Sequence, residues 1–185
     1  NSRLYEEHPD WIIGVKGRSN SPSRNQNVLD FSRSEVVDYI YEKIRDILSC
    51  GNIFYIKWDM NRNMTEIGSA TLPFNRQKEV AHRYILGLYS LLEKLTIEFP
   101  EILFESCASG GGRFDPAMLY YMPQTWASDN SDAIERLNIQ YGTSFAYPPI
   151  TMGAHVSAVP NHQLRRVTSL NTRANVAFFG AFGYE

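Results

Sequence analysis

Cysteine is scarce in this sequence, and its scarcity limits the class of protein. The 185 residues include two cysteines, Cys50 and Cys107, which are too few for a disulfide framework. We interpret both as reduced thiols, which predicts a cytoplasmic protein. Long apolar runs are also missing, since none approaches the roughly 20 residues that a membrane-spanning helix needs.

An excess of charge of one sign is lacking as well. The formal net charge is −2 at pH 7. Proteins that bind nucleic acid or an anionic membrane surface usually carry a marked positive excess. We therefore predict neither nucleic acid nor a membrane as a partner.

The motifs of several enzyme classes are absent. Gly-x-Ser-x-Gly, the nucleophile motif of many serine hydrolases, does not occur, and neither does the Walker pattern of nucleotide-binding loops. We expect no metal, because the four histidines show no metal-ligand spacing; they are His8, His82, His155 and His162. We also expect no organic cofactor.

What is present points to one α/β domain. Apolar residues make up 43% of the chain and aromatic residues 13%, enough for a sizeable core. Segments with strand and helix patterns alternate, which fits a (β/α) barrel or a doubly wound sheet. We count four or five strands, half to two-thirds of a barrel, since a complete barrel needs about 200–250 residues. We predict strands at 53–58, from 102, near 124–127 and at 151–157, and a short one at 11–15. We predict one helix after a capping box at Ser32–Glu35. Further helices are predicted at 76–98, 116–121 and 131–141, and within 163–179.

The chain is organised around residues 53–62, where four apolar residues precede Lys-Trp-Asp-Met-Asn-Arg. This pattern predicts a buried strand that delivers Asp59 to the rim of the sheet. Asp129 follows another short strand and would face the same rim. Two carboxylates across a scissile bond are what glycoside hydrolysis requires. Lys57 points to the same face as Asp59 and can stabilise its charge. The alternative is that Asp59 caps the next loop or pairs with Arg62.

A glycine-rich loop, residues 107–113, follows the strand that begins near 102. Its three glycines let the backbone approach a ligand closely. The loop could present amides to a substrate, cradle a phosphate, or be a flexible turn. Arg24 lies in a polar loop and, taken alone, is predicted to be a surface residue.

Three blocks of the sequence together resemble the signature blocks of glycoside hydrolase family 36, the bacterial and fungal α-galactosidases. They are Lys-Trp-Asp-Met-Asn-Arg at 57–62, Cys-x-x-Gly-x-x-Arg at 107–113 and Trp-Ala-Ser-Asp-Asn-Ser-Asp-Ala at 126–133. The blocks occur in the family's order and approximate spacing. The resemblance covers essentially the whole chain.

The resemblance implies a retaining mechanism with Asp59 as nucleophile and Asp129 as general acid/base. Cys107 and Gly110 match positions near the 2-hydroxyl of the sugar, which favours galactose over an N-acetylated sugar. The implied substrate is a terminal α-linked galactose in oligosaccharides such as melibiose and raffinose. The implied substrate-binding residues are Arg24, Lys57, Trp58, Asn61, Cys107 and Gly110.

Family members are several hundred residues long, so the resemblance implies that residues 1–185 are the C-terminal part of a (β/α)8 TIM barrel. The apolar tail at 178–185 also suggests a fragment. We expect the early barrel strands and the flanking β domains to be absent, the isolated fragment to be inactive and the full-length protein to be a homo-oligomer. In the intact site, the two carboxyl groups should lie about 5–5.5 Å apart.

Three other functions stay open. A raffinose synthase-like α-galactosyl transferase would use the same carboxylates with a sugar acceptor. A non-catalytic carbohydrate-binding protein would bind sugar without turnover. A phosphate-binding barrel enzyme would hold an anion at the glycine loop.

Overall fold

The computed structural model describes residues 2–21 and 23–185, and the chain divides into two compact units. The first unit combines the chain up to Phe54 with Arg62–Ile102. The second combines Tyr55–Asn61 with Leu103–Glu185. The strand that carries Asp59 therefore belongs to the second unit, and the segment that begins at Arg62 belongs to the first.

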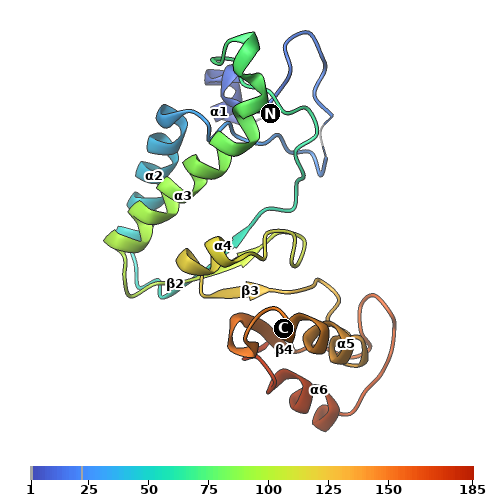
Figure 1. Ribbon diagram of the computed structural model, residues 1–185. Coiled ribbons are helices and arrows are strands. Elements are labelled where there is room, and N and C mark those ends of the chain that lie inside the picture. Colours follow the sequence, from blue (N-terminus) through green and yellow to red (C-terminus); the bar gives the residue numbers. More distant parts are fainter. Residues whose placement is uncertain (1, 22) are drawn as a thin grey trace. The chain divides into compact units, whose positions relative to one another are not determined.

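A five-stranded parallel sheet forms the centre of the second unit, with the strands in sequence order β1-β2-β3-β4-β5 (Figure 1). Parallel neighbours in sequence order are the arrangement that alternating strands and helices predict, so the α/β fold class is confirmed. The strands are β1 (Tyr55–Asp59), β2 (Leu103–Cys107), β3 (Gln124–Trp126), β4 (Met152–Val156) and β5 (Ala181–Tyr184). The helices of this unit are α4 (Pro116–Tyr121), α5 (Ala133–Ser144), η3 (Pro149–Thr151) and α6 (Leu170–Ala177).

Strand β1 differs from its prediction as a buried strand. It pairs only with β2 in this sheet, and its residues alternate between exposed and half-buried. As an edge strand it is covered less than the central strands. Asp59 is the last residue of β1 rather than the first residue after it.

Strand β5 was not predicted, because the residues 178–185 were interpreted as an apolar tail. It pairs with β4 along its full length, with Gly183 opposite His155. A Cβ atom at Gly183 would lie 2.6 Å from the His155 ring, so the close pairing needs a glycine there. The formation of β5 thus depends mainly on its pairing with β4.

The first unit contains two long helices, α2 (Ser34–Ser49) and α3 (Val80–Glu98), which pack side by side (Figure 1). Its shorter helices are α1 (Arg3–Glu7), η1 (Pro9–Trp11) and η2 (Phe74–Glu79). Gly87 of α3 touches the backbone of Phe31, whose oxygen would lie 1.7 Å from a Cβ atom at that position. The apolar stripe predicted for α3 is confirmed, since all of its residues are buried: Val80, Tyr84, Leu88, Leu91, Leu92 and Leu95.

The capping box predicted at the start of α2 is wrong. The helix begins at Ser34 with Arg33 as the N-cap, and no side chain caps it. Ser32 instead donates both its amide, at 3.0 Å, and its hydroxyl to the buried carboxylate of Asp30. Asp30 thus accepts the hydrogen bond from the Ser32 amide that Glu35 would accept in a capping box, and Glu35 pairs with Arg33 instead.

Two other predicted elements are shorter than expected. The strand expected at 11–15 is reduced to a single antiparallel bridge between Ile12 and Leu29. Within 163–179 only α6 is helical, because the Asn161 side chain accepts hydrogen bonds from the amides of Gln163 and Leu164 and closes a local turn.

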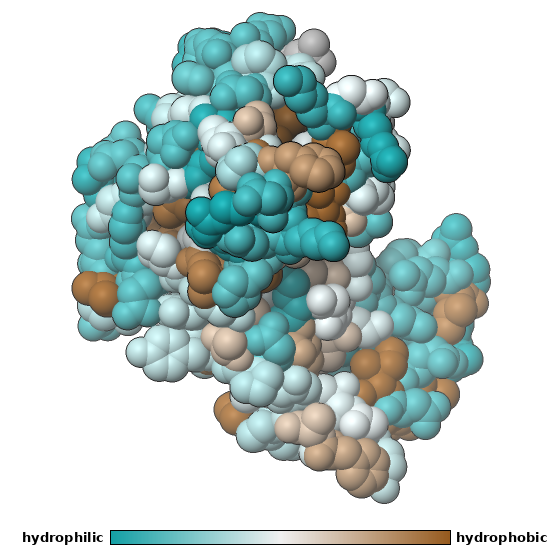
Figure 2. Space-filling view, turned by 45° about the horizontal axis from the view of Figure 1, so that its top comes forward, coloured by the Kyte–Doolittle hydropathy of each residue, from teal (hydrophilic) through white to brown (hydrophobic). Residues whose placement is uncertain are grey.

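Apolar residues are exposed among hydrophilic ones on the face shown in Figure 2. The exposed apolar residues of the second unit include Phe178, Phe182 and Tyr184, and the Phe182 ring contacts the rings of the other two. Within residues 2–21 and 23–185, no helix is both long and apolar enough to cross a membrane.

Candidate active site

Asp59 lies at the carboxyl end of β1, and its carboxylate is held by a neighbour in the chain. The Asn61 amide group donates a hydrogen bond to Asp59 Oδ2. Asn61 is itself fixed, because its Oδ1 atom accepts hydrogen bonds from the Ser109 amide, at 3.0 Å, and the Ser109 hydroxyl, at 3.2 Å. Asn61 thus links the end of β1 to the loop after β2 and orients the carboxylate.

Cys107 lies opposite Asp59 in the register of β1 and β2. It is buried, and burial raises the pKa of its thiol to about 11, with a hydrogen bond to the Asp59 carboxylate acting in the same direction. The thiol therefore stays protonated at neutral pH and acts as a hydrogen-bond donor rather than a nucleophile.

The glycine-rich loop after β2 approaches the end of β3. Gly110 has a φ of +83°, which favours glycine. A Cβ atom on Gly110 would lie 2.7 Å from Ser128 Cα and 3.1 Å from the Asp129 amide nitrogen. The two backbones are therefore in direct contact, and the loop brings the end of β3 next to the strand that carries Cys107.

Arg113 fixes this loop, a role that was not predicted. Its guanidinium donates to the carbonyl oxygens of Trp58, at 3.0 Å, and Cys107, at 2.8 Å. It joins the ends of β1 and β2 from the side of the loop. The Cys-x-x-Gly-x-x-Arg spacing pointed to this residue, but its partners are backbone atoms that the sequence does not identify.

Asp129 has a different environment from Asp59. It is exposed, and its carboxylate accepts no hydrogen bond from a residue among those described. It interacts electrostatically with Arg136 of α5, which is buried and lies 4.2 Å from the centre of the Trp126 ring. Burial lowers the pKa of Arg136 to about 10, and Glu185 and then Asp129 oppose that shift. One carboxylate is thus held by hydrogen bonds, while the other accepts none from the described residues.

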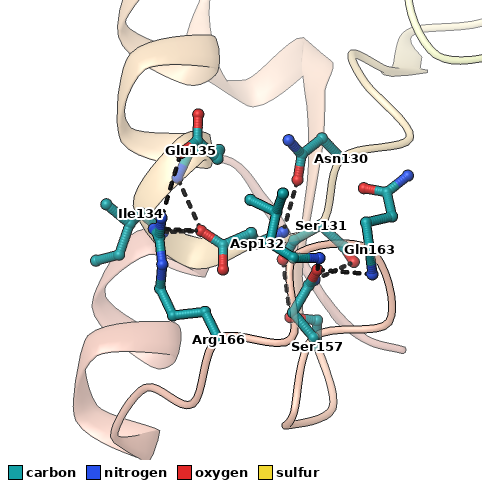
Figure 3. A network of polar contacts seen from close by, with 10 residues as sticks. Asn130, Ser131, Asp132, Ile134, Glu135, Ser157, Gln163 and Arg166 are labelled. Carbon is teal, nitrogen blue, oxygen red and sulfur yellow. Dashed lines mark hydrogen bonds and ion pairs between the residues drawn. The ribbon is translucent and has the colours of Figure 1, made fainter.

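The segment after Asp129 is stabilised by a polar network (Figure 3). The Asp132 carboxylate caps α5 by accepting hydrogen bonds from the amides of Ile134 and Glu135, both at 3.1 Å. The same carboxylate pairs with Arg166 at 2.8 Å. The Asp132 amide donates to the Asn130 side chain at 3.1 Å.

The neighbouring residue Ser131 connects this segment to the loop after β4. The Ser157 hydroxyl donates to the Ser131 carbonyl oxygen at 2.8 Å, and the Asn161 amide group donates to the Ser131 hydroxyl at 3.3 Å (Figure 3). Both ends of the segment are therefore anchored, and Asp129 is presented from a stable turn.

Replacing Asp132 with alanine should loosen this turn. The substitution removes the helix cap and the closer of two carboxylate partners of Arg166, so we expect a local loss of about 2 kcal/mol. Amide hydrogen exchange in the first turn of α5, measured in the full-length protein, should become faster. Asp115→Ala is the matched control, because Asp115 caps α4 in the same way, without an ion pair to an arginine. Equal losses of stability in Asp132→Ala and Asp115→Ala would contradict a contribution from the ion pair between Asp132 and Arg166.

Lys57 lies on the same face of β1 as Asp59, as predicted. Its ammonium group is 3.7 Å from Glu105 and 4.6 Å from the centre of the Trp126 ring. Trp58 lies between Lys57 and Asp59 in the strand, so its side chain is on the opposite face. Its assignment as a substrate-binding residue stays a prediction.

Arg24 belongs to the other unit, where it occupies the tip of a tight turn. Arg24 and Asn25 have φ values of 55° and 57°, and the turn is closed by a bridge between Ser23 and Gln26. Arg62 supports the turn, because its guanidinium donates to the Gln26 carbonyl oxygen at 3.2 Å. Arg62 was considered as a partner for Asp59, and it has this structural role instead. The predicted sugar contact of Arg24 remains a prediction.

The described residues contain no cluster of three or more His, Cys, Asp and Glu side chains that could hold a metal ion. Asp59 and Asp129 lie at the carboxyl ends of β1 and β3, on either side of β2. That is the edge where parallel α/β enzymes place catalytic groups.

Comparisons with known proteins agree with this arrangement. The melibiase family model matches residues 1–185. α-Galactosidase AgaA of Geobacillus stearothermophilus is 64% identical over 185 residues, which are all of this chain and 25% of that protein. Solved structures of variants of this GH36 enzyme in complex with raffinose and with stachyose each superpose with a TM-score of 0.97 at 63% identity, over all of this chain and 26% of theirs.

The chain thus spans about a quarter of the length of the relatives it matches. The resemblance to glycoside hydrolase family 36 is confirmed by the match of the family model and by both kinds of relative. A match over every residue, with the same fold at high identity, shows membership directly. The chain belongs to the melibiase family.

Proposed function

We propose that the protein containing this chain is a retaining α-galactosidase, with Asp59 as nucleophile and Asp129 as general acid/base. The observation that carries the proposal is the contrast between the two carboxylates. Asp59 is oriented by Asn61 and Cys107, whereas Asp129 accepts no hydrogen bond from a described residue. A nucleophile needs a fixed direction of attack, and an acid/base needs to exchange its proton.

In the proposed reaction, Asp129 donates its proton to the glycosidic oxygen as the bond from that oxygen to the anomeric carbon breaks. Asp59 attacks the anomeric carbon and forms a β-galactosyl ester. Asp129, now ionised, takes a proton from water. The water oxygen attacks the same carbon, the ester bond breaks, and α-galactose leaves with Asp59 ionised again. Two inversions give net retention, and no cofactor enters the balance.

The substrate class follows from the relatives. AgaA has been solved in complex with raffinose and with stachyose, which supports oligosaccharides with terminal α-linked galactose as substrates here. In the family resemblance, Cys107 and Gly110 match positions near the 2-hydroxyl of the sugar. This match supports a 2-hydroxyl rather than an acetamido group at that position.

The experiment follows the reaction of the full-length protein with p-nitrophenyl α-galactoside and raffinose by proton NMR. We expect the first galactose released to be the α anomer, before mutarotation. A β anomer would show inversion and contradict the assignment of Asp59 as nucleophile. With sucrose as the only acceptor, predominant transfer of galactose in place of hydrolysis would identify the raffinose synthase-like alternative. Sugar binding without turnover would identify a carbohydrate-binding protein.

A further inference from the structure

Glu105 is a fully buried carboxylate to which the proposed reaction assigns no role. It lies in the centre of β2 and has no exposed surface. Its Oε2 atom accepts hydrogen bonds from the Tyr55 hydroxyl, at 2.6 Å, and from the Gln124 amide group. Both hydrogen bonds are thus donated to the same oxygen. A buried charge of this kind is costly unless another charge compensates it.

Lys57 supplies that charge. Its ammonium group lies 3.7 Å from Oε1 of Glu105, an oxygen with no hydrogen-bond donor among the described residues. His155 also lies within the field of Glu105, but burial lowers the pKa of its ring, so it is mostly neutral at pH 7. Arg136 feels the charge of Glu105 more weakly than those of Glu185 and Asp129. Lys57 is therefore the principal partner.

The register places this pair directly below the candidate active site. Lys57 pairs with Glu105, and Glu105 with Gln124, so the three form one row across β1, β2 and β3. The next row on the same face contains Asp59 opposite Cys107. The Glu105 carboxylate is thus one layer beneath the proposed nucleophile.

The position of the ammonium group is also restricted from two other sides. It lies 4.6 Å from the centre of the Trp126 ring, within the range of a cation–π contact. A Cβ atom at Gly153 would lie 3.0 Å from the Trp126 ring and 3.5 Å from Glu105 Oε2, so this region is tightly packed. Glu105 and Trp126 together limit the directions in which the Lys57 side chain can extend.

We propose that Glu105 is a positioning residue, which holds the Lys57 ammonium beneath Asp59 so that it can bind a hydroxyl group of the galactosyl unit. The inference rests on the proposed function, because it assumes that a sugar occupies the face that bears Asp59. Glu105 itself does not reach the sugar. Its effect on binding passes through Lys57.

A double-mutant cycle in the full-length protein tests the inference. Glu105→Gln keeps the shape of the side chain and removes its charge. We expect it to raise KM for p-nitrophenyl α-galactoside by about 10- to 100-fold, with a smaller change in kcat, because a charged hydrogen-bonding partner is lost. In a Lys57→Met background, the same substitution should change KM by less than about twofold, since the group through which Glu105 acts is gone.

The matched control is Glu101→Gln, the same substitution at an exposed glutamate just before β2, which should leave KM and kcat unchanged. Effects of Glu105→Gln that are equal in the two backgrounds would overturn the inference and indicate a structural role. If Glu105→Gln does not fold, Tyr55→Phe takes its place, because it removes one donor to the carboxylate. Its smaller effect must likewise vanish in the Lys57→Met background. Absence of turnover in the unmodified protein would instead contradict the proposed function.

Discussion

Replacing Asp59 with asparagine should lower kcat of the full-length protein on p-nitrophenyl α-galactoside by on the order of 10⁵-fold. An amide cannot form the galactosyl ester, so the reaction loses its covalent step. Asparagine has the shape of aspartate and can still accept a hydrogen bond from Asn61. Folding should be unchanged, and galactose should still bind, as calorimetry can measure.

A variant with a smaller side chain at position 59 shows whether activity is lost because the nucleophile is missing or because the site is disturbed. Asp59→Gly leaves room for azide, which should restore turnover and give the β-galactosyl azide by a single inversion. Asp46→Asn, at an exposed aspartate of α2 in the other unit, is the matched control and should retain full activity. Activity within tenfold of the unmodified protein in Asp59→Asn would refute the assignment of the nucleophile.

Replacing Asp129 with alanine should lower kcat/KM for raffinose by about 10²- to 10⁴-fold, because the departing sugar oxygen is no longer protonated. The loss should be much smaller for 2,4-dinitrophenyl α-galactoside, whose leaving group needs no proton. Steady-state kinetics on the two substrates measure this difference directly. Azide should accelerate the second step, in which the galactosyl ester is cleaved, and give the α-galactosyl azide. Asp59→Gly, by contrast, should give the β-galactosyl azide.

The dependence on the leaving group distinguishes chemistry from positioning. Asp132→Ala loosens the turn that presents Asp129 but leaves the carboxyl group in place. Its losses on raffinose and on the dinitrophenyl substrate should therefore be similar. If Asp129→Ala also lowered both by the same factor, its role as general acid would be wrong.

Much of the α/β fold could be predicted from sequence, because local patterns determine it. The stripe of α3 repeats at helical spacing, and the buried face of the helix follows it residue by residue. Asp59 and Asp129 were recognised because each follows a short run of apolar or aromatic residues. Such features depend on residues that are close together in the chain.

Features that depend on distant residues were missed. The hydrogen bonds to Glu105 come from Tyr55, 50 positions earlier, and Gln124, 19 positions later. A glutamate in a strand of unknown register gives no signal of such partners. Strand β5 depends in the same way on its pairing with β4. The capping box at Ser32 failed for a different reason, since Asp30 is close in sequence but was not considered as a competing acceptor.

The contact between the Gly110 turn and Ser128 bears on how this site can diversify. It is made by main-chain atoms, so it requires one glycine and no particular side chain around it. Under the proposed function, a substitution at Ala127 can alter the groups that surround the sugar without separating the ends of β2 and β3. The stereochemical course of glycoside hydrolysis depends on the spacing of the two carboxylates. A lineage with this backbone contact can therefore acquire new sugar preferences and still retain the configuration of its product.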